Sequence, residues 1–370
     1  MTKHSARSGT RLKARFQQNR FTPSVRRRFI KLLTLFLQVA TLCLLLLSVA
    51  GYAGRLHKLP ELASHFKLQY LLGSLACLLL FLSLHSSWSW PLVATLCVVI
   101  NAAAIFPLYV SPANAGSNVP PERRLRLMLA NVNYANQRYE RLIDLVGIEQ
   151  PDVLVLQEVS ERWITQLRSL ESRYPFHLAA SFDDDGSGIA LYSRLPLEDA
   201  RIVRLGSVED VERPGITARV RVGDERLSLL TIHPRAPLLP NHFEYRNEQL
   251  ADAARFVRDL PVPHVFVGDL NTTPWSPYYK DFIARSGLVD ARRGSGILPS
   301  FPTFLPFGAL LRLPIDHCFV DQNVIVLSIK TGSEFGSDHL PLIVELGLEP
   351  TGADDDIDCD AVLKTKFKRR

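Results

Sequence analysis

The sequence has few cysteines, and none stands in a pattern that binds metal or builds a disulfide framework. Five cysteines occur in 370 residues, with no Cys-x-x-Cys pair and no Cys/His spacing of a zinc site. We therefore interpret all five as small apolar or incidental residues. Internal repeats and low-complexity tracts are also missing, so nothing in the sequence indicates a repeat architecture.

A basic surface for duplex nucleic acid is not evident in the globular part of the chain. The net charge is +6, yet residues 1–67 alone carry 13 Lys or Arg and a single acidic residue, Glu61. Residues 122–348 carry 25 basic and 30 acidic residues, a net charge of −5. The positive charge therefore belongs to the N-terminal region, which argues against non-specific DNA binding by the globular region.

Long apolar runs follow the basic N-terminal tail, residues 1–28. They cover about residues 29–53, 66–84 and 88–110, and each is long enough to cross a bilayer. Other interpretations are a signal peptide for the first run and buried core helices for the others. The first run is too long for the apolar part of a signal peptide, and two more follow it. We therefore expect a membrane domain of three helices within 29–110.

The charge of the N-terminal tail predicts the topology. Arg26–Arg28 and the other basic residues of the tail place this end in the cytoplasm by the positive-inside rule. Three spans would then put residues 122–370 on the opposite face, and two spans would reverse this. We expect a multi-pass protein of the bacterial inner (cell) membrane, with an extracytoplasmic globular domain. The lipid bilayer is its predicted partner, and no protein partner is predicted.

Beyond a Pro/Ser/Asn/Gly-rich linker at 111–121, the chain reads as an α/β domain at 122–348 and a disordered charged tail at 349–370. Strand patterns are expected at 124–130, 153–157, 188–193, 202–205, 216–222, 227–231, 265–267, 315–320, 324–329 and 341–346. Helices are expected at 136–149, 160–170, 241–258 and 276–285, the last two with Asn241 and Ser276 as N-caps. Many strands with four helices between them favour two packed sheets with helices outside.

The stretch 261–275 carries the most informative pattern. Val265–Val267 is typical of a buried strand, and Gly268 allows a close turn at its end. Asp269 and Asn271 then project in the same direction if the strand geometry continues. A carboxylate and an amide at that point suit a metal-bound water or a phosphate oxygen. An Asx turn that merely closes the strand is the alternative.

Polar groups of complementary chemistry also follow other strand patterns. They are Asn131, Glu158, His233, Asp316, and the pair Asp338 and His339. Glu158 and Asp338 are hard oxygen donors that suit Mg²⁺ or Mn²⁺. His339 could move a proton beside the metal, and Asp316 could orient a histidine. The remaining groups could donate hydrogen bonds to a developing phosphorane, so the whole set serves attack by water on a phosphoester.

The successive motifs resemble those of the endonuclease/exonuclease/phosphatase (DNase I-like) superfamily. They are LANVN (129–133), LQEV (156–159), TIHPRAP (231–237), GDLN (268–271), IDHCFV (315–320) and SDHLPL (337–342). Their order and spacing match across nearly all of 122–348. The resemblance implies a four-layer αββα sandwich with the active site at one rim of the two sheets.

The resemblance also implies roles for single residues. Glu158 would be the metal carboxylate with Asn131 beside it, and Asp338 a second metal or water contact. Asp269 would align or deprotonate the attacking water, and Asn271 would bind phosphate. Three further residues complete the set: His339 as general acid/base or phosphate-binding histidine, Asp316 as its partner, and His233 as the histidine of the DNase I-like branch.

Three further expectations concern substrate contacts. Arg194 follows a strand pattern and could contact a phosphate or form a surface salt bridge. Trp275 could line the cleft or pack in the core. The run TTPWSPYY, residues 272–279, is expected to face the substrate, whose class the sequence leaves open.

The sequence therefore predicts a membrane-anchored, divalent-metal-dependent phosphoesterase. Its substrate would be a nucleic acid, a phospholipid head group or a soluble phosphoester. The alternative is a catalytically silent binding or scaffold module of the same fold. A degenerate copy should have lost Glu158, Asp269, Asp338 or His339, and all four are present.

Overall fold

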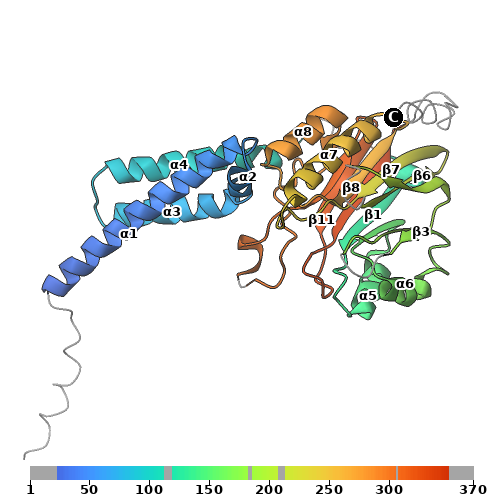
Figure 1. Ribbon diagram of the computed structural model, residues 1–370, viewed down its shortest axis with the longest axis horizontal. Coiled ribbons are helices and arrows are strands. Elements are labelled where there is room, and N and C mark those ends of the chain that lie inside the picture. Colours follow the sequence, from blue (N-terminus) through green and yellow to red (C-terminus); the bar gives the residue numbers. More distant parts are fainter. Residues whose placement is uncertain (1–22, 112–118, 182–185, 207–212, 306, 350–370) are drawn as a thin grey trace, which may run out of the picture.

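The computed structural model describes residues 23–111, 119–181, 186–206, 213–305 and 307–349. Most of the predicted N-terminal tail and linker, and nearly all of the predicted C-terminal tail, therefore lie outside the described residues. The described chain forms an elongated helical bundle that is joined at one end to an α/β domain (Figure 1).

Three long helices form the bundle: α1 (Pro23–Ala50), α3 (Lys67–Ser83) and α4 (Ser89–Ile105). A short helix, α2 (Lys58–Ser64), precedes α3. Helices α1 and α4 run towards the α/β domain, whereas α3 begins beside the domain and runs away from it (Figure 1). The start of α1 and the α/β domain therefore lie at opposite ends of the bundle.

Two helices of the bundle are long and apolar enough to cross a membrane. They are α1 with its 3₁₀ extension (Pro23–Ala53) and α4 with its extension (Ser89–Tyr109). Helix α3 has 17 residues and becomes a third candidate only together with α2, from which it is bent by 66°. The prediction of a complete span at 66–84 is therefore corrected. The predicted helix is present, but α3 alone is too short to count as a span, and α2 lengthens it only across the bend.

The α/β domain contains two six-stranded sheets. The first sheet has the order β11-β12-β1-β2-β4-β3, and the second has the order β5-β6-β7-β8-β10-β9. The strands of the first sheet are β1 (Arg124–Asn131), β2 (Val153–Gln157), β3 (Phe176–Ala180), β4 (Ile189–Ser193), β11 (Val324–Thr331) and β12 (Leu342–Leu348). Those of the second are β5 (Leu197–Arg204), β6 (Pro214–Val222), β7 (Glu225–Ile232), β8 (His264–Asp269), β9 (Val289–Asp290) and β10 (Asp316–Val320).

Helices cover the outer face of each sheet. They are α5 (Tyr139–Glu149), α6 (Glu161–Leu167), α7 (His242–Arg258) and α8 (Pro277–Ser286). Short 3₁₀ turns lie elsewhere in the described chain, at Gly51–Ala53, Phe106–Tyr109, Pro121–Arg123, Arg168–Leu170 and Gly308–Leu310. In β1, Leu127 and Leu129 belong to the core between the sheets, whereas Met128 and Ala130 pack with α5 and α6. This two-sided burial explains why β1 reads as a continuous apolar run. The predicted four-layer αββα sandwich is confirmed.

Candidate active site

The polar groups that follow the strands meet at one rim because parallel strands end on the same side. Strands β1 and β2 are parallel, with Asn131 opposite Gln157. Strands β7 and β8 are parallel too, which brings His233, just after β7, to the end of β8. Asp316 begins β10 directly opposite Asp269 in an antiparallel pair. The rim therefore collects groups from both sheets.

Gly268 is required by a close approach between β8 and β7. A Cβ atom at this position would lie 2.3 Å from the carbonyl oxygen of Ile232. Gln157 crosses between the sheets here: its Nε2 donates to the Ile232 oxygen (2.7 Å), and its Oε1 accepts from the Asp269 backbone N–H (2.8 Å). The buried Gln157 thereby fixes the end of β8 and the backbone that carries Asp269.

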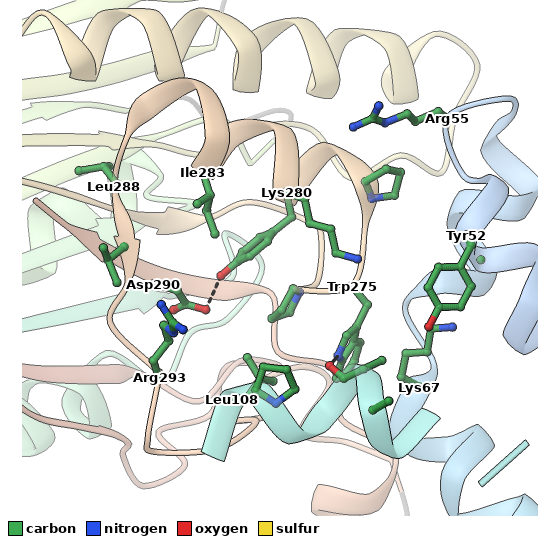
Figure 2. Close-up of a pocket in the computed structure, with 18 residues that line it drawn as sticks. Tyr52, Arg55, Lys67, Leu108, Trp275, Lys280, Ile283, Leu288, Asp290 and Arg293 are labelled. Carbon is green, nitrogen blue, oxygen red and sulfur yellow. Dashed lines mark hydrogen bonds between the residues drawn. The ribbon is translucent and has the colours of Figure 1, made fainter. Parts of the chain in front are cut away.

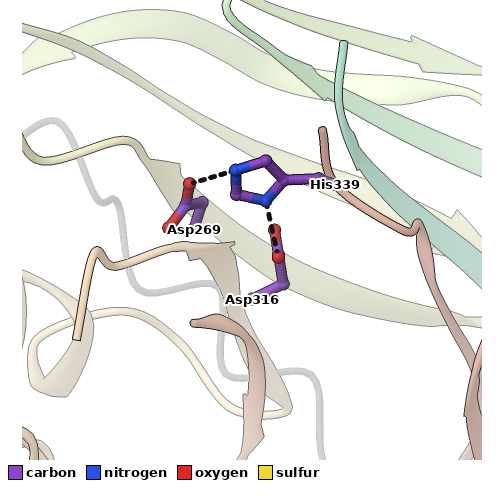
Figure 3. Close-up of side chains that lie close together, drawn as sticks. All are labelled: Asp269, Asp316 and His339. Atoms are coloured by element: carbon purple, nitrogen blue, oxygen red, sulfur yellow. Dashed lines mark hydrogen bonds and ion pairs between the residues drawn. The ribbon is translucent and has the colours of Figure 1, made fainter. Parts of the chain in front are cut away.

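His339 lies between two buried carboxylates (Figure 3). Its Nδ1 is 2.9 Å from Asp316 Oδ2, and its Nε2 is 3.6 Å from Asp269 Oδ2. The loop that carries His339 is fastened to β1, because Ser337 Oγ donates to the Asn131 carbonyl (2.7 Å) and accepts from the His339 N–H (3.1 Å). The predicted pairing of His339 with Asp316 is present in the structure.

Burial and charge decide the protonation of this group. Burial by itself would lower the pKa of His339, but Asp316 and then Asp269 attract the proton and raise that pKa to about 10. Burial raises the pKa of Asp269 to about 7; Asp316 adds to the rise and His339 opposes it. Near neutral pH the group thus combines an imidazolium with a carboxyl group able to gain or lose a proton.

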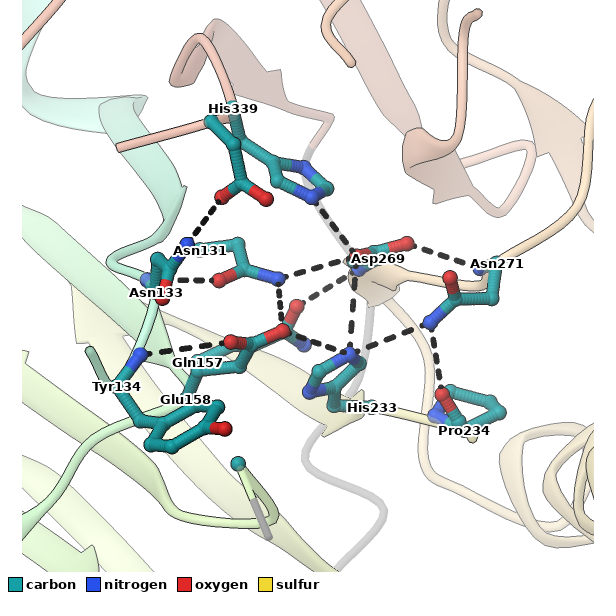
Figure 4. A network of polar contacts seen from close by, with 12 residues as sticks. Asn131, Asn133, Tyr134, Gln157, Glu158, His233, Pro234, Asp269, Asn271 and His339 are labelled. Carbon is teal, nitrogen blue, oxygen red and sulfur yellow. Dashed lines mark hydrogen bonds and ion pairs between the residues drawn. The ribbon is translucent and has the colours of Figure 1, made fainter. Parts of the chain in front are cut away.

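A second set of contacts joins Glu158 to Asp338 through Asn131 and Asn133, both labelled in Figure 4. Asn131 Nδ2 donates to Glu158 Oε1 (2.9 Å) and to Asp269 Oδ2 (3.2 Å). Asn133 Nδ2 donates to Asp338 Oδ1 (3.0 Å), and its N–H donates to Asn131 Oδ1 (3.0 Å). Asn131 therefore connects the Glu158 carboxylate with that of Asp269.

Glu158 and Asp338 form the donor set that suits a hard divalent cation. Burial raises the pKa of Glu158, and the nearby Asp338 carboxylate adds to the rise. A cation between such carboxylates would relieve their repulsion, and Mg²⁺ is commonly held by one or two carboxylates. The residues fit the predicted roles: Glu158 and Asp338 would hold Mg²⁺ or Mn²⁺, with Asn131 beside them.

Another group offers ligand atoms but is less suited to a metal. The group consists of Asp269, Asp316 and His339. Each offers one carboxylate oxygen or ring nitrogen, and these three atoms all lie within 4.8 Å of one another. With its pKa raised to about 10, however, His339 is protonated near neutral pH in the metal-free protein, so a metal ion at this position would have to displace that proton. We therefore interpret these three residues as a proton-handling group.

His233 and Asn271 complete the rim. Asn271 Nδ2 donates to the Pro234 carbonyl (2.9 Å) and lies 3.3 Å from His233 Nε2, which is itself 3.6 Å from Asp269 Oδ2. Burial lowers the pKa of His233 well below its usual value, and the nearby Arg213 lowers it further. His233 is therefore a neutral imidazole, able to donate one hydrogen bond to a phosphate oxygen.

Three rim residues have left-handed backbone conformations. The φ angles are +60° for Glu158, +57° for Asn133 and +49° for Asn271. Asparagine tolerates this region, but for glutamate it is unusual, and such positions cost on the order of 1 kcal/mol or more. The surrounding contacts hold Glu158 in this conformation, and strain of this kind is concentrated at functional sites.

A buried ion pair that no sequence pattern predicted connects the helical bundle to the rim. Glu61 in α2 is 1% exposed and accepts from Arg246 Nη2 (3.0 Å), Ser276 Oγ (2.7 Å) and the His65 ring (3.2 Å). Arg246, fully buried in α7, also donates to the Asn271 carbonyl (3.0 Å). The one available signal was that Glu61 is the only acidic residue in the first 67.

Residues 272–279, expected to face a substrate, contact the helical bundle instead. Thr273 Oγ1 is 2.9 Å from the His65 ring, and the Trp275 indole N–H donates to the Ala104 carbonyl (3.2 Å). Trp275 packs in an apolar cluster with Ile105, Leu108 and Ile297. The idea that Trp275 lines a substrate cleft is therefore corrected, because the bundle covers this side of the domain.

Arg194 lies at the opposite end of the first sheet from the rim. Strand β4 is antiparallel to β2, and Ser193 pairs with Val153 at the far end from Gln157. The Arg194 guanidinium lies over the Tyr174 ring, 5.4 Å from its centre. The structure therefore does not bring Arg194 to the other predicted residues, which argues against its predicted contact with a substrate phosphate.

The family assignment rests on a sequence match across the whole rim. The profile of the endonuclease/exonuclease/phosphatase family matches residues 128–339, more than half of the chain. The chain belongs to this family. The matched region begins in β1 and ends at His339, so it includes every strand end described above. The resemblance seen in the motifs is thereby confirmed.

Solved structures of low sequence identity share the fold of the domain. An endonuclease/exonuclease/phosphatase from Bacteroides vulgatus has a TM-score of 0.53 and 21% identity, over 61% of this chain and 99% of that one. The human nocturnin catalytic domain with bound sulfate has a TM-score of 0.52 and 19% identity, over 61% and 95%. Humanized D. rerio TDP2 has 0.51 and 18%, over 61% and 99%. No curated protein matches the chain.

Proposed function

We propose that this protein is a membrane-anchored phosphoesterase that depends on a divalent metal. The observation that carries the proposal is the continuous contact network from Glu158 through Asn131 to Asp269, His339 and Asp316. In this proposal Glu158 is the metal carboxylate, and its contact with Asn131, which also binds Asp269, supports a role beside the proton-handling group. Members of this family generally hydrolyse phosphoester bonds, which agrees with that chemistry.

The proton-handling residues have distinct roles in this proposal. Asp269, whose pKa is near 7, accepts a proton from the attacking water and is oriented by Asn131 and the Asn271 N–H (2.9 Å). The His339 imidazolium, kept charged by Asp316, stabilises negative charge that develops on the phosphoryl oxygens. His233 and the Asn271 amide position the phosphate by hydrogen bonds.

A bound Mg²⁺ or Mn²⁺ would supply Lewis-acid polarisation of a phosphoryl oxygen. The chain contributes Glu158 and Asp338 as its carboxylate ligands and Asn131 as the residue that orients Glu158. The left-handed backbone of Glu158 presents this carboxylate at the rim.

The exposed surface of the helical bundle supports membrane anchoring. Phe29, Leu32, Phe36 and Leu46 of α1 are each exposed by at least 65%, and Leu92 of α4 by 66%. A continuous apolar surface of this kind is unfavourable in water and favourable in lipid. Helices α1 and α4 both run towards the α/β domain, so this proposal uses α2 with α3 as the bent third crossing between them. The basic start of α1 then favours a cytoplasmic N-terminus, with the α/β domain at the other end of the bundle on the extracytoplasmic side.

The test uses the full-length protein in detergent micelles. Hydrolysis would be measured on plasmid DNA, an aryl phosphodiester, sphingomyelin and inositol phosphates, with Mg²⁺, with Mn²⁺ and with EDTA. We expect metal-dependent turnover on at least one substrate, and a loss of about 10²-fold or more in Asp269→Ala and His339→Ala. Two matched controls with exposed side chains, Asp224→Ala and His177→Ala, should retain activity.

Two outcomes would decide against this proposal. Absence of metal-dependent turnover on every substrate would favour the scaffold alternative. Turnover that survives both rim substitutions would mean that the activity does not arise at this rim. For the topology, protease accessibility in intact cells should show the α/β domain outside the cytoplasm.

A further inference from the structure

A cavity of about 880 Å³ lies where the helical bundle meets the α/β domain (Figure 2). One wall comes from the 3₁₀ turn after α1, including Tyr52, and from Lys67 at the start of α3. A second wall comes from the end of α4 and the turn after it, including Leu108, and a third from α8 and the residues around Arg293. The segments that build the cavity are far apart in the sequence, and the active-site rim contributes none of its polar groups to the lining.

Basic side chains dominate the charged lining. Arg55, Lys67, Lys280 and Arg293 line the cavity, against one carboxylate, Asp290. That carboxylate is already engaged by the Tyr279 hydroxyl and the Arg292 guanidinium. The lining therefore has an excess of positive charge that its own acidic residue does not neutralise.

The four cations differ in how they are satisfied. Arg55 pairs with Asp281, and Lys67 donates to the Ser48 carbonyl (2.7 Å). In the ranges that the structure describes, the Lys280 ammonium and the Arg293 guanidinium have no hydrogen-bond or ion-pair partner. Burial lowers the pKa of Lys280, and Arg55 lowers it further. An anion bound beside Lys280 would offset the repulsion from Arg55 and so raise the pKa of Lys280.

The rest of the lining is largely apolar and includes the end of the second candidate span. Ala103, Ala104 and Pro107 belong to the last turns of α4 and its extension, where the second candidate span ends. Trp275 and Ile283 face them from the α/β domain. The cavity thus has an apolar side continuous with the spans and a cationic side at the domain, and aromatic and basic residues are common at this level.

We propose that this cavity binds the head group of an anionic phospholipid from the surrounding bilayer. The phosphate lies beside Lys280, whose charge is close enough to Arg55 and Lys67 to affect them, and Arg293 adds positive charge at the other side of the cavity. The glycerol and upper acyl chains lie against the end of α4. This inference rests on the membrane anchoring in the proposed function but not on its catalytic activity. Bound lipid would fill the space between the spans and the domain, and so fix how the domain sits on the membrane.

The test measures lipid binding by the full-length protein in detergent micelles. Binding of short-chain phosphatidylglycerol and phosphatidylcholine would be compared by thermal shift and by native mass spectrometry. Inorganic phosphate and glycerol phosphate form separate arms, which distinguish a lipid from a free phosphate. We expect phosphatidylglycerol to bind more tightly than phosphatidylcholine, and a weakening of about tenfold or more in the double variant Lys280→Gln/Arg293→Gln.

Arg285→Gln provides the matched control, because Arg285 is an exposed cation of α8 that does not line the cavity. It should bind phosphatidylglycerol like the unmodified protein. Equal binding of the two lipids would overturn the inference, as would a double variant that binds as tightly as the control. Equally tight binding of inorganic phosphate would overturn the assignment to a lipid. None of these readouts requires turnover, so they remain decisive even if the enzyme assay fails.

Discussion

The active-site rim and the cavity at the bundle contain similar numbers of charged residues but arrange them differently. At the rim, each charge faces an opposite or hydrogen-bonding partner, as His339 does between Asp316 and Asp269. At the cavity, Lys280 and Arg293 face open space together with further cations. The first arrangement is a site whose protein groups already hold one another in place. The second presents several like charges in one space, where an anion could pair with them.

Buried residues around Arg292 lie between the two regions and contact both. Arg292 pairs with Asp290 on the cavity side and donates to the Asp316 carbonyl (2.9 Å) on the rim side. It also contacts His317, whose Nε2 lies 2.8 Å from the Thr272 carbonyl. His317 is thus held between Arg292 and the Thr272 carbonyl among these buried residues.

The largest expected effect tests the partnered charges of the rim. Asp316→Asn removes the carboxylate that keeps His339 protonated, so the pKa of His339 should fall. We expect kcat to drop about 10²-fold or more, with a smaller change in KM, because the imidazolium acts on charge that develops in the transition state. Steady-state kinetics and the pH profile of kcat would be measured. An unchanged kcat would show that His339 does not need this partner.

The next effect concerns the ion pair through which the bundle reaches the rim. Glu61→Gln leaves Arg246 buried without its carboxylate, which typically costs about 3–5 kcal/mol. Activity should fall as well, because Arg246 holds the Asn271 carbonyl. Thermal unfolding and kcat would be compared among Glu61→Gln, Arg246→Gln and the double variant. Losses that simply add would contradict a direct interaction between the two residues.

A smaller effect is expected on the pH dependence of stability, through the buried side chain of His317. Burial, and then Arg292, lowers the pKa of His317 well below its usual value, so the folded protein keeps it neutral. Below about pH 6.5 the unfolded chain binds a proton at His317 that the folded chain does not. The free energy of unfolding therefore does not suffer from this group above that pH and decreases as the pH falls below it. His317→Gln should weaken the dependence of the unfolding temperature on pH between neutral and mildly acidic buffer. An equally steep dependence in the variant would exclude His317 as a cause.

The smallest effect is expected at Arg194. Its guanidinium lies over Tyr174 at the far end of the first sheet from the rim. We expect Arg194→Gln to leave kcat/KM unchanged and to lower the unfolding temperature slightly through loss of the cation–π contact. A large rise in KM would restore the substrate contact that the sequence suggested.

Much of the fold could be predicted because the strand patterns are strongly apolar. The predicted strand at 153–157 matches β2 and the helix at 241–258 nearly matches α7, but β3 was missed because its residues are only partly buried. Ser276 caps α8 as expected, whereas the Asn241 side chain caps nothing. An N-cap requires a particular backbone conformation, and Asn241 has the left-handed one instead.

The sequence by itself determined the family, the αββα architecture and the rim residues. Each rim residue directly follows a strand or stands in a short motif, so its chemistry and its position can be read together. Only the tertiary structure decided that Glu61 reaches Asn271 through Arg246, that TTPWSPYY faces the bundle, and that cations from four segments share one cavity. These contacts join residues far apart in the chain, and no local pattern encodes the packing of one domain against another.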